Sequence, residues 1–466
     1  MLTYDLSGNG KPMYEQLYDR IREDILTGKL LPDSKMPSKR MLAGNLGVSI
    51  ITVENAYELL ISEGYLYAVP KVGYYVENIA DRSRRTGGHA SGLHIAMPES
   101  ETFLFDFSSN SSEPGSFPFS VWAKLMRETI SCRETELLKV PPSGGIPELR
   151  AAIADYLSSF RGMSVDPDQI IVGAGTEYLY GLLIQLLGRD KTYCVENPGY
   201  RKIKQIYESN HVSCVPVEMD EKGLVVDRLL EQSAQIAHVS PTHHFPTGIT
   251  MPASRRYELL RWADGDDDRY IIEDEYDSEF RMNGKPVPTL FSMDSGQKVI
   301  YMNTFSKSLT ATIRISYMIL PETLANLFYR NLDFYSCTVS TFEQYTLAEF
   351  IARGYFEKHI NRMRLHYKRK REQVLRLIRE IFTEQECRII EKDSGLHFIL
   401  EFHTSMGDRE LEQELRRKKI RISAVTDYDM NPERRNVHQF ILNYSGVDTE
   451  RLKDALEEVR SCIVCS

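Results

Sequence analysis

The sequence predicts an α/β protein with a mostly parallel sheet and a smaller C-terminal α+β domain, preceded by a small helical unit. From residue 106 onward, short apolar runs alternate with stretches of helical period, which is the pattern of strands joined by crossover helices. The region before residue 77 shows helices followed by two short strands. A chain of 466 residues also exceeds what one hydrophobic core usually serves, so more than one domain is expected.

The composition excludes several classes of protein. With 42% hydrophobic and 26% charged residues, the chain has the composition of an ordinary soluble globular protein. The net charge of -9 argues against general adhesion to nucleic acid or anionic membranes, although a local binding face remains compatible with it. The chain has no run of membrane-span length and no signal pattern, so we expect a cytoplasmic protein without membrane contact. The seven cysteines predict neither a disulfide framework nor a metal site, and the CxxC spacing of Cys462 and Cys465 favours free thiols.

Three helices are expected in the first part of the chain. A serine precedes the second and the third, where its hydroxyl can accept from free N–H groups, and Gly47 forms the tight turn between them. A short helix, a glycine turn and a second capped helix make a helix-turn-helix. The expected bounds are Pro12 to Leu31 with Gly28 ending the helix, Lys39 to Leu46 after Ser38, and Ile50 to about Ser62 after Ser49.

The third of these helices has an apolar face and an outward face. Ile50, Thr52 and Asn55 are expected to point outward near its first turns. Two short strands around a Pro/Gly turn, between residues 64 and 76, predict a wing. From the pattern alone, a small helical module for protein interaction remains the alternative. The apolar face consists of Val53, Ala56, Tyr57 and Leu60.

A lysine and a carboxylate stand at the ends of two predicted strands. Asp274 ends an apolar run that begins at residue 270, and Lys307 follows the run at 299–302. Because ligands bind beyond the carboxyl ends of strands in open α/β sheets, the two side chains could face one crevice. Pyridoxal phosphate needs such a pair, with an amine to form the imine and an acid to keep the ring nitrogen protonated. A structural ion pair is the alternative interpretation of the same charges.

A glycine loop, Gly173-Ala174-Gly175-Thr176, leads from a strand into a helix. The free N–H groups of such a helix start suit a phosphate. Residues 78–105 are polar, basic and glycine-rich, which predicts a flexible linker. The other expected elements are helices at 149–160, 177–187 and from beyond 353 to about 382, and strands at 169–172, 192–195, 236–240, 396–402 and 440–444.

Residues 12–77 closely resemble the winged-helix domain of GntR-type bacterial transcription regulators. The family run L-P-S-x-R-x-L-A-x-x-L-G-V-S-x-x-T-V recurs from Met36 onward with few changes. The resemblance implies binding to double-stranded operator DNA, with backbone contacts before the second helix and groove contacts from the start of the third. The family often has arginine where this chain has Ile50 and glycine where it has Lys71, so the base preference stays open. The DNA-facing residues implied are Ser38, Arg40, Ser49, Thr52, Asn55 and Lys71.

Residues 106–446 resemble a fold-type I aminotransferase, and the whole chain resembles the MocR/GabR family of pyridoxal-phosphate-dependent regulators, which includes PdxR-like members. The motifs that carry the resemblance are 196–200 (ENPGY), 241–248 (PTHHFPTG), 273–277 (EDEYD) and 306–309 (SKSL) with Arg314. The domains implied are 1–77 for DNA binding, 78–105 as the linker and 106–466 as the effector domain.

The resemblance also implies a role for each matching residue. Lys307 would form the Schiff base with pyridoxal phosphate, Asp274 would pair with the ring nitrogen, and Tyr276 would bind the ring hydroxyl. Tyr200 would stack on the ring face. The phosphate would be bound by Gly175, Thr176, Thr304, Ser306 and Arg314.

Three departures from the enzyme pattern bear on the effector. Phe245 stands where aminotransferases usually carry asparagine, and Val140 stands where a partner-chain tyrosine is usual. The last strand region shows no arginine to clamp a substrate carboxylate. An amino acid would therefore bind weakly or be held by another cation, for which the candidates are Arg201, Lys202 and Arg281.

The pattern favours a homodimeric regulator that senses pyridoxal phosphate, alone or with an amino compound, and controls genes of vitamin B6 or amino-acid metabolism. The alternative is a working aminotransferase with an accessory N-terminal domain, against which Phe245 and the missing clamp count. The sequence leaves the target genes, the sign of regulation, the effector and residual transaminase activity open.

Overall fold

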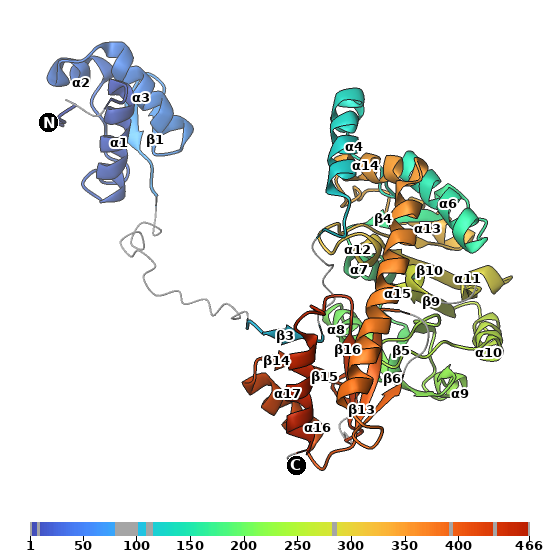
Figure 1. Cartoon of the computed structure of the whole chain (residues 1–466). Coiled ribbons are helices and arrows are strands. Elements are labelled where there is room, and N and C mark those ends of the chain that lie inside the picture. The colour runs from blue at the N-terminus through green and yellow to red at the C-terminus, as the bar shows by residue number, and fades with distance from the viewer. Residues whose placement is uncertain are drawn as a thin grey trace. The chain divides into compact units, whose positions relative to one another are not determined.

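The computed structural model of the chain describes residues 2–6, 10–79, 101–108, 115–281, 287–390, 395–431 and 436–464. These residues form two compact units, Met1–Ser100 and Glu101–Ser466, each with a hydrophobic core of its own (Figure 1). Cys465 and residues 80–100, which hold most of the expected linker, lie outside the described residues. No helix in the described ranges is long and apolar enough to cross a lipid bilayer.

The N-terminal unit is the expected three-helix fold with a two-stranded wing. One apolar face of each helix is buried, and the predicted core residues of α3 are all fully buried. The strands of the wing pair antiparallel, with Leu66 opposite Val76. The elements of this unit are α1 (Met13–Leu26), α2 (Lys39–Leu46), α3 (Ile50–Ser62), β1 (Leu66–Val69) and β2 (Gly73–Val76).

Local side-chain chemistry sets the helix ends in this unit. Ser38 and Ser49 cap α2 and α3, each accepting from the N–H group three residues ahead, at 3.2 Å and 3.0 Å. The predicted extension of α1 to Leu31 is wrong, because the helix ends at Leu26. There the hydroxyl of Thr27 donates to a carbonyl of the preceding turn, and Gly28 adopts the left-handed conformation that turns the chain away.

The large unit is built on an eight-stranded sheet with the order β4-β11-β10-β9-β8-β5-β6-β7. The five strands from β10 to β6 run parallel, while β11 runs antiparallel between β4 and β10. The predicted mostly parallel sheet is thus confirmed. The strands are β4 (Ile170–Gly173), β5 (Thr192–Asn197), β6 (Ser213–Asp220), β7 (Gly223–Leu224), β8 (Ile236–Val239), β9 (Tyr270–Glu275), β10 (Val299–Thr304) and β11 (Ser316–Ile319).

Both faces of this sheet are covered by helices, so its central strands are apolar on both sides. Successive residues serve opposite faces: Ile272 packs with α7 and α13, and Ile271 packs with α10. The helical segments are α4 (Phe119–Cys132), α5 (Glu134–Leu137), α6 (Pro147–Arg161), η2 (Pro167–Gln169), α7 (Thr176–Leu187), α8 (Arg201–Ser209), α9 (Val226–Glu231), α10 (Ala253–Asp264), η3 (Ser278–Phe280), α11 (Leu290–Met293), α12 (Phe305–Ser308), α13 (Glu322–Asn331) and α14 (Thr341–Ala352).

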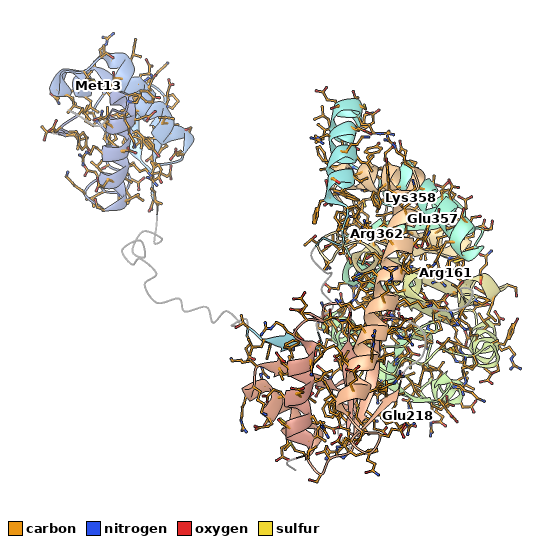
Figure 2. The ribbon with its side chains drawn as sticks, viewed as in Figure 1. Met13, Arg161, Glu218, Glu357, Lys358 and Arg362 are labelled. Atoms are coloured by element: carbon orange, nitrogen blue, oxygen red, sulfur yellow. The ribbon has the colours of Figure 1, made fainter. Side chains whose placement is uncertain are left out.

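The long helix α15 (Tyr355–Ile381) joins the region of α14 to the smaller C-terminal sheet (Figure 1). It is amphipathic, with Phe356 and Ile360 buried while Glu357, Lys358 and Arg362 face outward (Figure 2). The C-terminal sheet has the order β12-β13-β16-β15 and is antiparallel, as the predicted α+β domain requires. The remaining elements are β3 (Phe105–Asp106), β12 (Cys387–Ile390), β13 (His397–Phe402), α16 (Asp408–Arg417), β14 (Ile420–Arg421), β15 (Ser423–Ala424), η4 (Val425–Tyr428), β16 (Gln439–Asn443) and α17 (Leu452–Val464).

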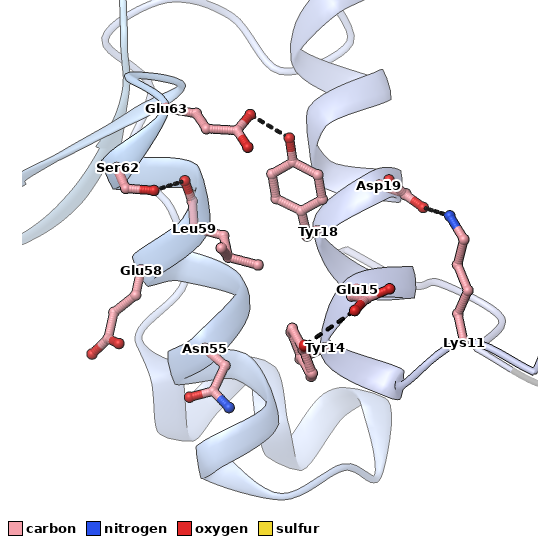
Figure 3. Close-up of a pocket in the computed structure, with 10 residues that line it drawn as sticks. All are labelled: Lys11, Tyr14, Glu15, Tyr18, Asp19, Asn55, Glu58, Leu59, Ser62 and Glu63. Carbon is pink, nitrogen blue, oxygen red and sulfur yellow. Dashed lines mark hydrogen bonds and ion pairs between the residues drawn. The ribbon is translucent and has the colours of Figure 1, made fainter. Parts of the chain in front are cut away.

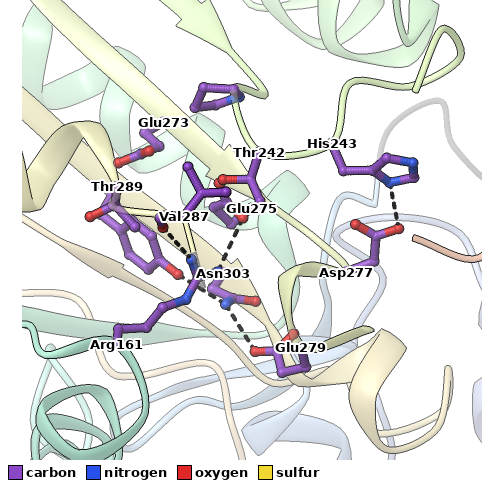
Figure 4. Close-up of polar contacts among 12 residues, drawn as sticks. Arg161, Thr242, His243, Glu273, Glu275, Asp277, Glu279, Val287, Thr289 and Asn303 are labelled. Carbon is purple, nitrogen blue, oxygen red and sulfur yellow. Dashed lines mark hydrogen bonds and ion pairs between the residues drawn. The ribbon is translucent and has the colours of Figure 1, made fainter. Parts of the chain in front are cut away.

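Two of the three consecutive carboxylates that end β9 hold the fold together. Glu273 accepts from the N–H groups of Leu290 at 2.7 Å and Phe291 at 2.9 Å, which fixes the start of α11. Glu275 lies 3.3 Å from the guanidinium of Arg161, both side chains being at most 3% exposed (Figure 4). A buried charge without such partners would be costly, so both contacts stabilise the end of β9.

The six cysteines within the described ranges are free thiols, as the spacing predicted. Burial raises the pKa of the Cys194 and Cys387 thiols to about 12, so both stay protonated near neutral pH. These thiols therefore act as small apolar side chains within the core.

Replacing Arg161 by alanine tests the buried ion pair. Arg161→Ala leaves the carboxylate of Glu275 buried without its cation, so we expect the free energy of unfolding to fall by about 3–5 kcal/mol. The control is Arg416→Ala, which breaks an exposed, solvent-screened pair with Glu101 and should leave the free energy of unfolding nearly unchanged. Urea unfolding followed by circular dichroism measures both. A loss for Arg161→Ala no larger than the control's would show that the pair does not stabilise the sheet.

Candidate functional site

The site lies at the carboxyl ends of β9 and β10, which are adjacent and parallel. Their register places Asp274 opposite Met302, and Lys307 follows β10 within α12. Burial lowers the pKa of the Lys307 amine to about 8, against the opposing effect of the Asp277 carboxylate. A much larger share of this amine is therefore neutral near pH 7.5 than for an exposed lysine, as nucleophilic attack on a carbonyl requires.

The two oxygens of the Asp274 carboxylate have different surroundings. Oδ2 accepts from the hydroxyl of Tyr180 and lies 3.3 Å from Nε2 of His238. On its other side the His238 ring is held by Tyr207, whose hydroxyl lies 2.7 Å from Nδ1. Oδ1 is buried and has no hydrogen-bond partner in the described part of the chain. An unpartnered buried acceptor is costly, and a protonated ring nitrogen would satisfy it.

The residues expected to bind a phosphate surround the start of α7. Gly175 has φ of 94°, and a Cβ built there would lie 2.5 Å from Nη2 of Arg314, so only glycine admits the arginine. The guanidinium of Arg314 is half exposed and lies 3.6 Å from Glu177, which leaves it within reach of an anion. The N–H of Gly175 donates to Gly173 at 2.9 Å, so this residue provides room and Thr176 is the N–H donor that remains.

Two further hydroxyl groups, those of Thr304 and Ser306, belong to this candidate phosphate site. Thr304 ends β10, and its oxygen accepts from the N–H of Ser306 and from the hydroxyl of Ser316. Its own hydrogen is then available to an anion. The Ser306 hydroxyl donates to the carbonyl of Ile313 at 2.9 Å, so it holds the loop that positions Arg314. The donor set fits a phosphate group, and the pair Lys307 and Asp274 fits a pyridine aldehyde.

Tyr276 and His243 form a buried group next to the amine. Nδ1 of His243 lies 2.8 Å from the carboxylate of Asp277 and 3.1 Å from the hydroxyl of Tyr276 (Figure 4 shows the first contact). If Nδ1 donates its hydrogen to the nearer carboxylate, the tyrosine keeps its own hydrogen for another acceptor. Burial raises the pKa of Tyr276 well above its usual range, so it acts as a hydroxyl donor.

Next to this group lies a cluster of aromatic side chains around Phe245, which we call the wall. Phe245 packs edge-on against Tyr200, His397 and Tyr428, with ring centroids 6.3, 5.1 and 4.9 Å away. Burial lowers the pKa of His397 to about 3, so its ring is neutral. Behind Phe245, an apolar cluster includes Ile441 of the last strand, where the sequence shows no arginine. The described wall is therefore apolar and uncharged.

Two of the three basic candidates for an effector carboxylate bind other groups. Arg201 donates to the carbonyl of Asp427 at 3.1 Å, and Lys202 pairs with Glu177. Val140, at the position of the usual partner-chain tyrosine, is 76% exposed. The contact of His244 with Glu196, at 3.5 Å, adds no charge, because burial lowers the pKa of the histidine to about 3 and raises that of the glutamate to about 8.

The sequence motifs did not reveal Tyr180, Tyr207 and His238. They come from α7, α8 and β8 and meet only because these elements pack around the end of β9. Tyr180 and His238 lie within apolar runs and Tyr207 lies on the buried face of a polar helix, so each resembles an ordinary core residue. The one local signal was polarity, since His238 interrupts a buried strand whose other residues are aliphatic.

In the N-terminal unit, the residues expected at DNA gather around one lysine. Lys39, at the start of α2, pairs with Glu54 of α3 and lies 5.6 Å from the ring of Tyr74 in the wing. Arg40 follows it and is exposed. Lys71 occupies the turn of the wing with φ of 64°, the left-handed conformation in which glycine is more usual. The hydroxyl of Thr52 lies 2.8 Å from that of Ser49, so these two residues form one capped corner.

This unit also carries an acidic groove between α1 and α3, with a volume of about 670 Å³ (Figure 3). Its carboxylates come from Glu15, Asp19, Glu58 and Glu63, and Asn55 also lines it. A groove of this charge repels phosphates. Of the six residues expected at DNA, Asn55 thus lies on the acidic side, whereas Ser38, Arg40, Ser49, Thr52 and Lys71 lie around α2, the first turn of α3 and the wing.

Comparison with known proteins matches both units to families. Residues 13–76 match the bacterial regulatory proteins of the gntR family, and residues 104–459 match aminotransferase class I and II. The uncharacterized HTH-type transcriptional regulator YdeL of Bacillus subtilis is 36% identical, with 97% of this chain and 96% of that protein covered. The probable rhizopine catabolism regulatory protein MocR of Rhizobium meliloti is 31% identical over 97% and 94% of the two chains.

Two further similarities concern the effector unit and its fold. The HTH-type pyridoxine biosynthesis transcriptional regulator PdxR of Corynebacterium glutamicum is 30% identical, with 83% of this chain and 82% of that protein covered. The structure of Pyrococcus horikoshii kynurenine aminotransferase in complex with PMP superposes with a TM-score of 0.68 at 22% identity. It covers 78% of this chain and 91% of its own, and at this identity the likeness shows the fold alone.

The pKa of Lys307 predicts how covalent attachment of pyridoxal phosphate depends on pH. Only the neutral amine reacts, so the rate should rise about tenfold per pH unit below pH 8 and level off above it. Borohydride trapping at a series of pH values, followed by peptide mapping, measures the modified fraction at this lysine. Exposed lysines in the same digest are the internal control and should keep rising toward pH 10. A rate at Lys307 that rises in parallel with them would contradict the lowered pKa.

Arg40 and Thr52 should affect DNA binding in different ways. Arg40→Ala removes a contact to the phosphate backbone, so affinity should fall on specific and random duplexes alike and the salt dependence should decrease by about one ion. Thr52→Ala should weaken specific binding more than random binding, because this residue starts the recognition helix. Fluorescence anisotropy at several salt concentrations measures both. Equal losses on specific and random DNA for Thr52→Ala would contradict this division of roles.

Proposed function

This chain belongs to the GntR-type transcription regulators of the MocR/PdxR kind, which carry an aminotransferase class I and II domain, and we propose that it binds pyridoxal phosphate at Lys307 and adjusts its affinity for operator DNA accordingly. The observation that carries the proposal is the buried amine of Lys307 next to a strand that ends in a carboxylate with one unpartnered oxygen. Burial of the Lys307 amine and of the unsatisfied Asp274 oxygen both cost free energy in the isolated chain. One ligand that bonds to both groups would offset both costs.

In this proposal each side chain has a stated task toward the coenzyme. When bound, pyridoxal phosphate supplies an aldehyde for an amine and a ring that withdraws electrons. Lys307 presents the neutral amine, and Asp274 accepts from the ring nitrogen with Oδ1 while Tyr180 and His238 hold Oδ2. Tyr276 donates to the ring oxygen. Thr176, Thr304 and Arg314 bind the phosphate, for which Gly175 leaves room.

The apolar wall supports the coenzyme itself as the principal signal. Phe245 and its neighbours offer no charged partner to a carboxylate, and two of the candidate cations are paired with other groups. An amino acid would have to bury its carboxylate against this wall without compensation. Genes of vitamin B6 supply are the targets this favours, since a regulator that measures the coenzyme can limit its synthesis. The pyridoxine biosynthesis regulator among the relatives agrees with this choice.

A working aminotransferase remains the second candidate, because Lys307, Asp274 and Tyr276 are all present. The apolar wall disfavours it, since turnover needs an amino acid held by its carboxylate. Full turnover with a panel of amino acids and 2-oxoglutarate, followed through the coenzyme spectrum, separates the two candidates. Repeated cycles would make the chain an enzyme.

DNA affinity of the intact chain should depend on the coenzyme. With pyridoxal phosphate present, we expect operator affinity to change about fivefold to 150-fold, the usual range of a coupling free energy of about 1–3 kcal/mol. In Lys307→Ala, both this response and the visible absorption of the holoprotein should disappear. The matched control is Lys204→Ala, which removes a lysine of α8 that pairs with Glu208 outside the proposed site, and it should keep both.

A fragment of residues 1–79 supplies a second control. It has a complete hydrophobic core, so it should fold and bind DNA without responding to the coenzyme. The proposal fails if the coenzyme leaves the intact chain's affinity unchanged, or if the fragment responds as the intact chain does. A borohydride-reducible chromophore in Lys307→Ala would place the attachment point elsewhere.

A further inference from the structure

The first turn of α3 exposes two adjacent isoleucines. Ile50 is 46% exposed and Ile51 is 67% exposed, whereas the apolar residues farther along one face of the same helix are fully buried. They directly follow the cap residue Ser49, so they stand at the leading end of the helix. Large apolar side chains exposed side by side indicate contact with a partner.

The surrounding charges indicate which partner this is. Lys39 connects the start of α2, the first turns of α3 and the wing, with Arg40 beside it in sequence and Lys71 at the tip of the wing. Farther along α3, Asn55, Glu58 and Leu59 line the acidic groove that this helix forms with α1 (Figure 3). Between residues 1 and 79 acidic residues outnumber basic ones, so a polyanion is attracted to this one side of the unit. A duplex bound there meets both isoleucines.

Isoleucine can read only one feature of the major groove. It has no donor or acceptor for the base edges, and the apolar group that a base presents there is the C5-methyl of thymine. We propose that Ile50 and Ile51 contact thymine methyl groups and set the base preference of this chain. The inference rests on the DNA-binding function proposed above, and it assigns a specificity role to two residues that carry no polar chemistry. It also accounts for a recognition helix whose next exposed residues are Asn55 and Glu58, neither of which is a cation that would bind a phosphate.

Uracil substitution tests the proposal, because uracil keeps the pairing of thymine and lacks only its methyl group. Duplexes recovered from a randomised pool by the full-length protein serve as probes, and each thymine is replaced in turn. We expect a recurring thymine in each half-site whose replacement lowers affinity about fourfold, the effect of one buried methyl group. Recovered duplexes without a common thymine, or equal affinity for thymine and uracil at every position, would overturn the proposal.

Two variants assign the effect to the isoleucines. The double variant Ile50→Ala with Ile51→Ala should bind thymine and uracil duplexes equally. Met13→Ala removes another exposed apolar side chain of the same unit, at the start of α1, and should keep the fourfold ratio (Figure 2). Thermal unfolding should be unchanged in both, since the replaced side chains are exposed. A fourfold ratio that survives in the double variant would overturn the proposal, and failure to bind any duplex would overturn the DNA-binding function with it.

Discussion

The parallel pairing of β9 with β10 is the constraint on which the large unit depends. Because side chains alternate along a strand, a shift by one residue would exchange Asp274 with Glu273 or Glu275. Neither could take its place: the first holds the start of α11 through two N–H groups, and the second is paired with Arg161. The three consecutive carboxylates therefore have three separate tasks. The register of β9 against β10 decides which carboxylate has which task.

This distribution also explains how so many buried charges are tolerated. Burial raises the pKa of Glu273 to about 7, and the charge of Glu275 acts in the same direction, while the cation of Arg256 opposes both. The buried groups at this end of the sheet thus share partners and protons. The free oxygen of Asp274 is one of the buried acceptors at this end of the sheet that have no hydrogen-bond partner in the described part of the chain. That atom costs free energy in folding, and in the function proposed above the bound coenzyme would offset this cost.

What the sequence could predict follows from the range of each interaction. The caps Ser38 and Ser49 act on the next turn, so the bounds of α2 and α3 were predictable, and the strand-end placement of Lys307 was visible as a local pattern. The end of α1 was not predictable, because the apolar spacing continues past Thr27, whereas the hydroxyl of Thr27 bonds back to the preceding turn of the helix. The contacts of Tyr180 and His238 with Asp274 were hidden as well, since they depend on packing between distant segments.

The lowered pKa of Lys307 has a consequence for chemical selectivity. A neutral buried amine condenses with aldehydes in general, so the amine by itself cannot distinguish one carbonyl metabolite from another. Discrimination between carbonyl compounds must come from the far end of the site, where Arg314 and Thr304 can donate hydrogen bonds to a dianion. Unphosphorylated pyridoxal would meet the same amine and carboxylate but leave these donors unfilled. In the function proposed above, the chain would therefore respond to pyridoxal phosphate and not to unphosphorylated pyridoxal.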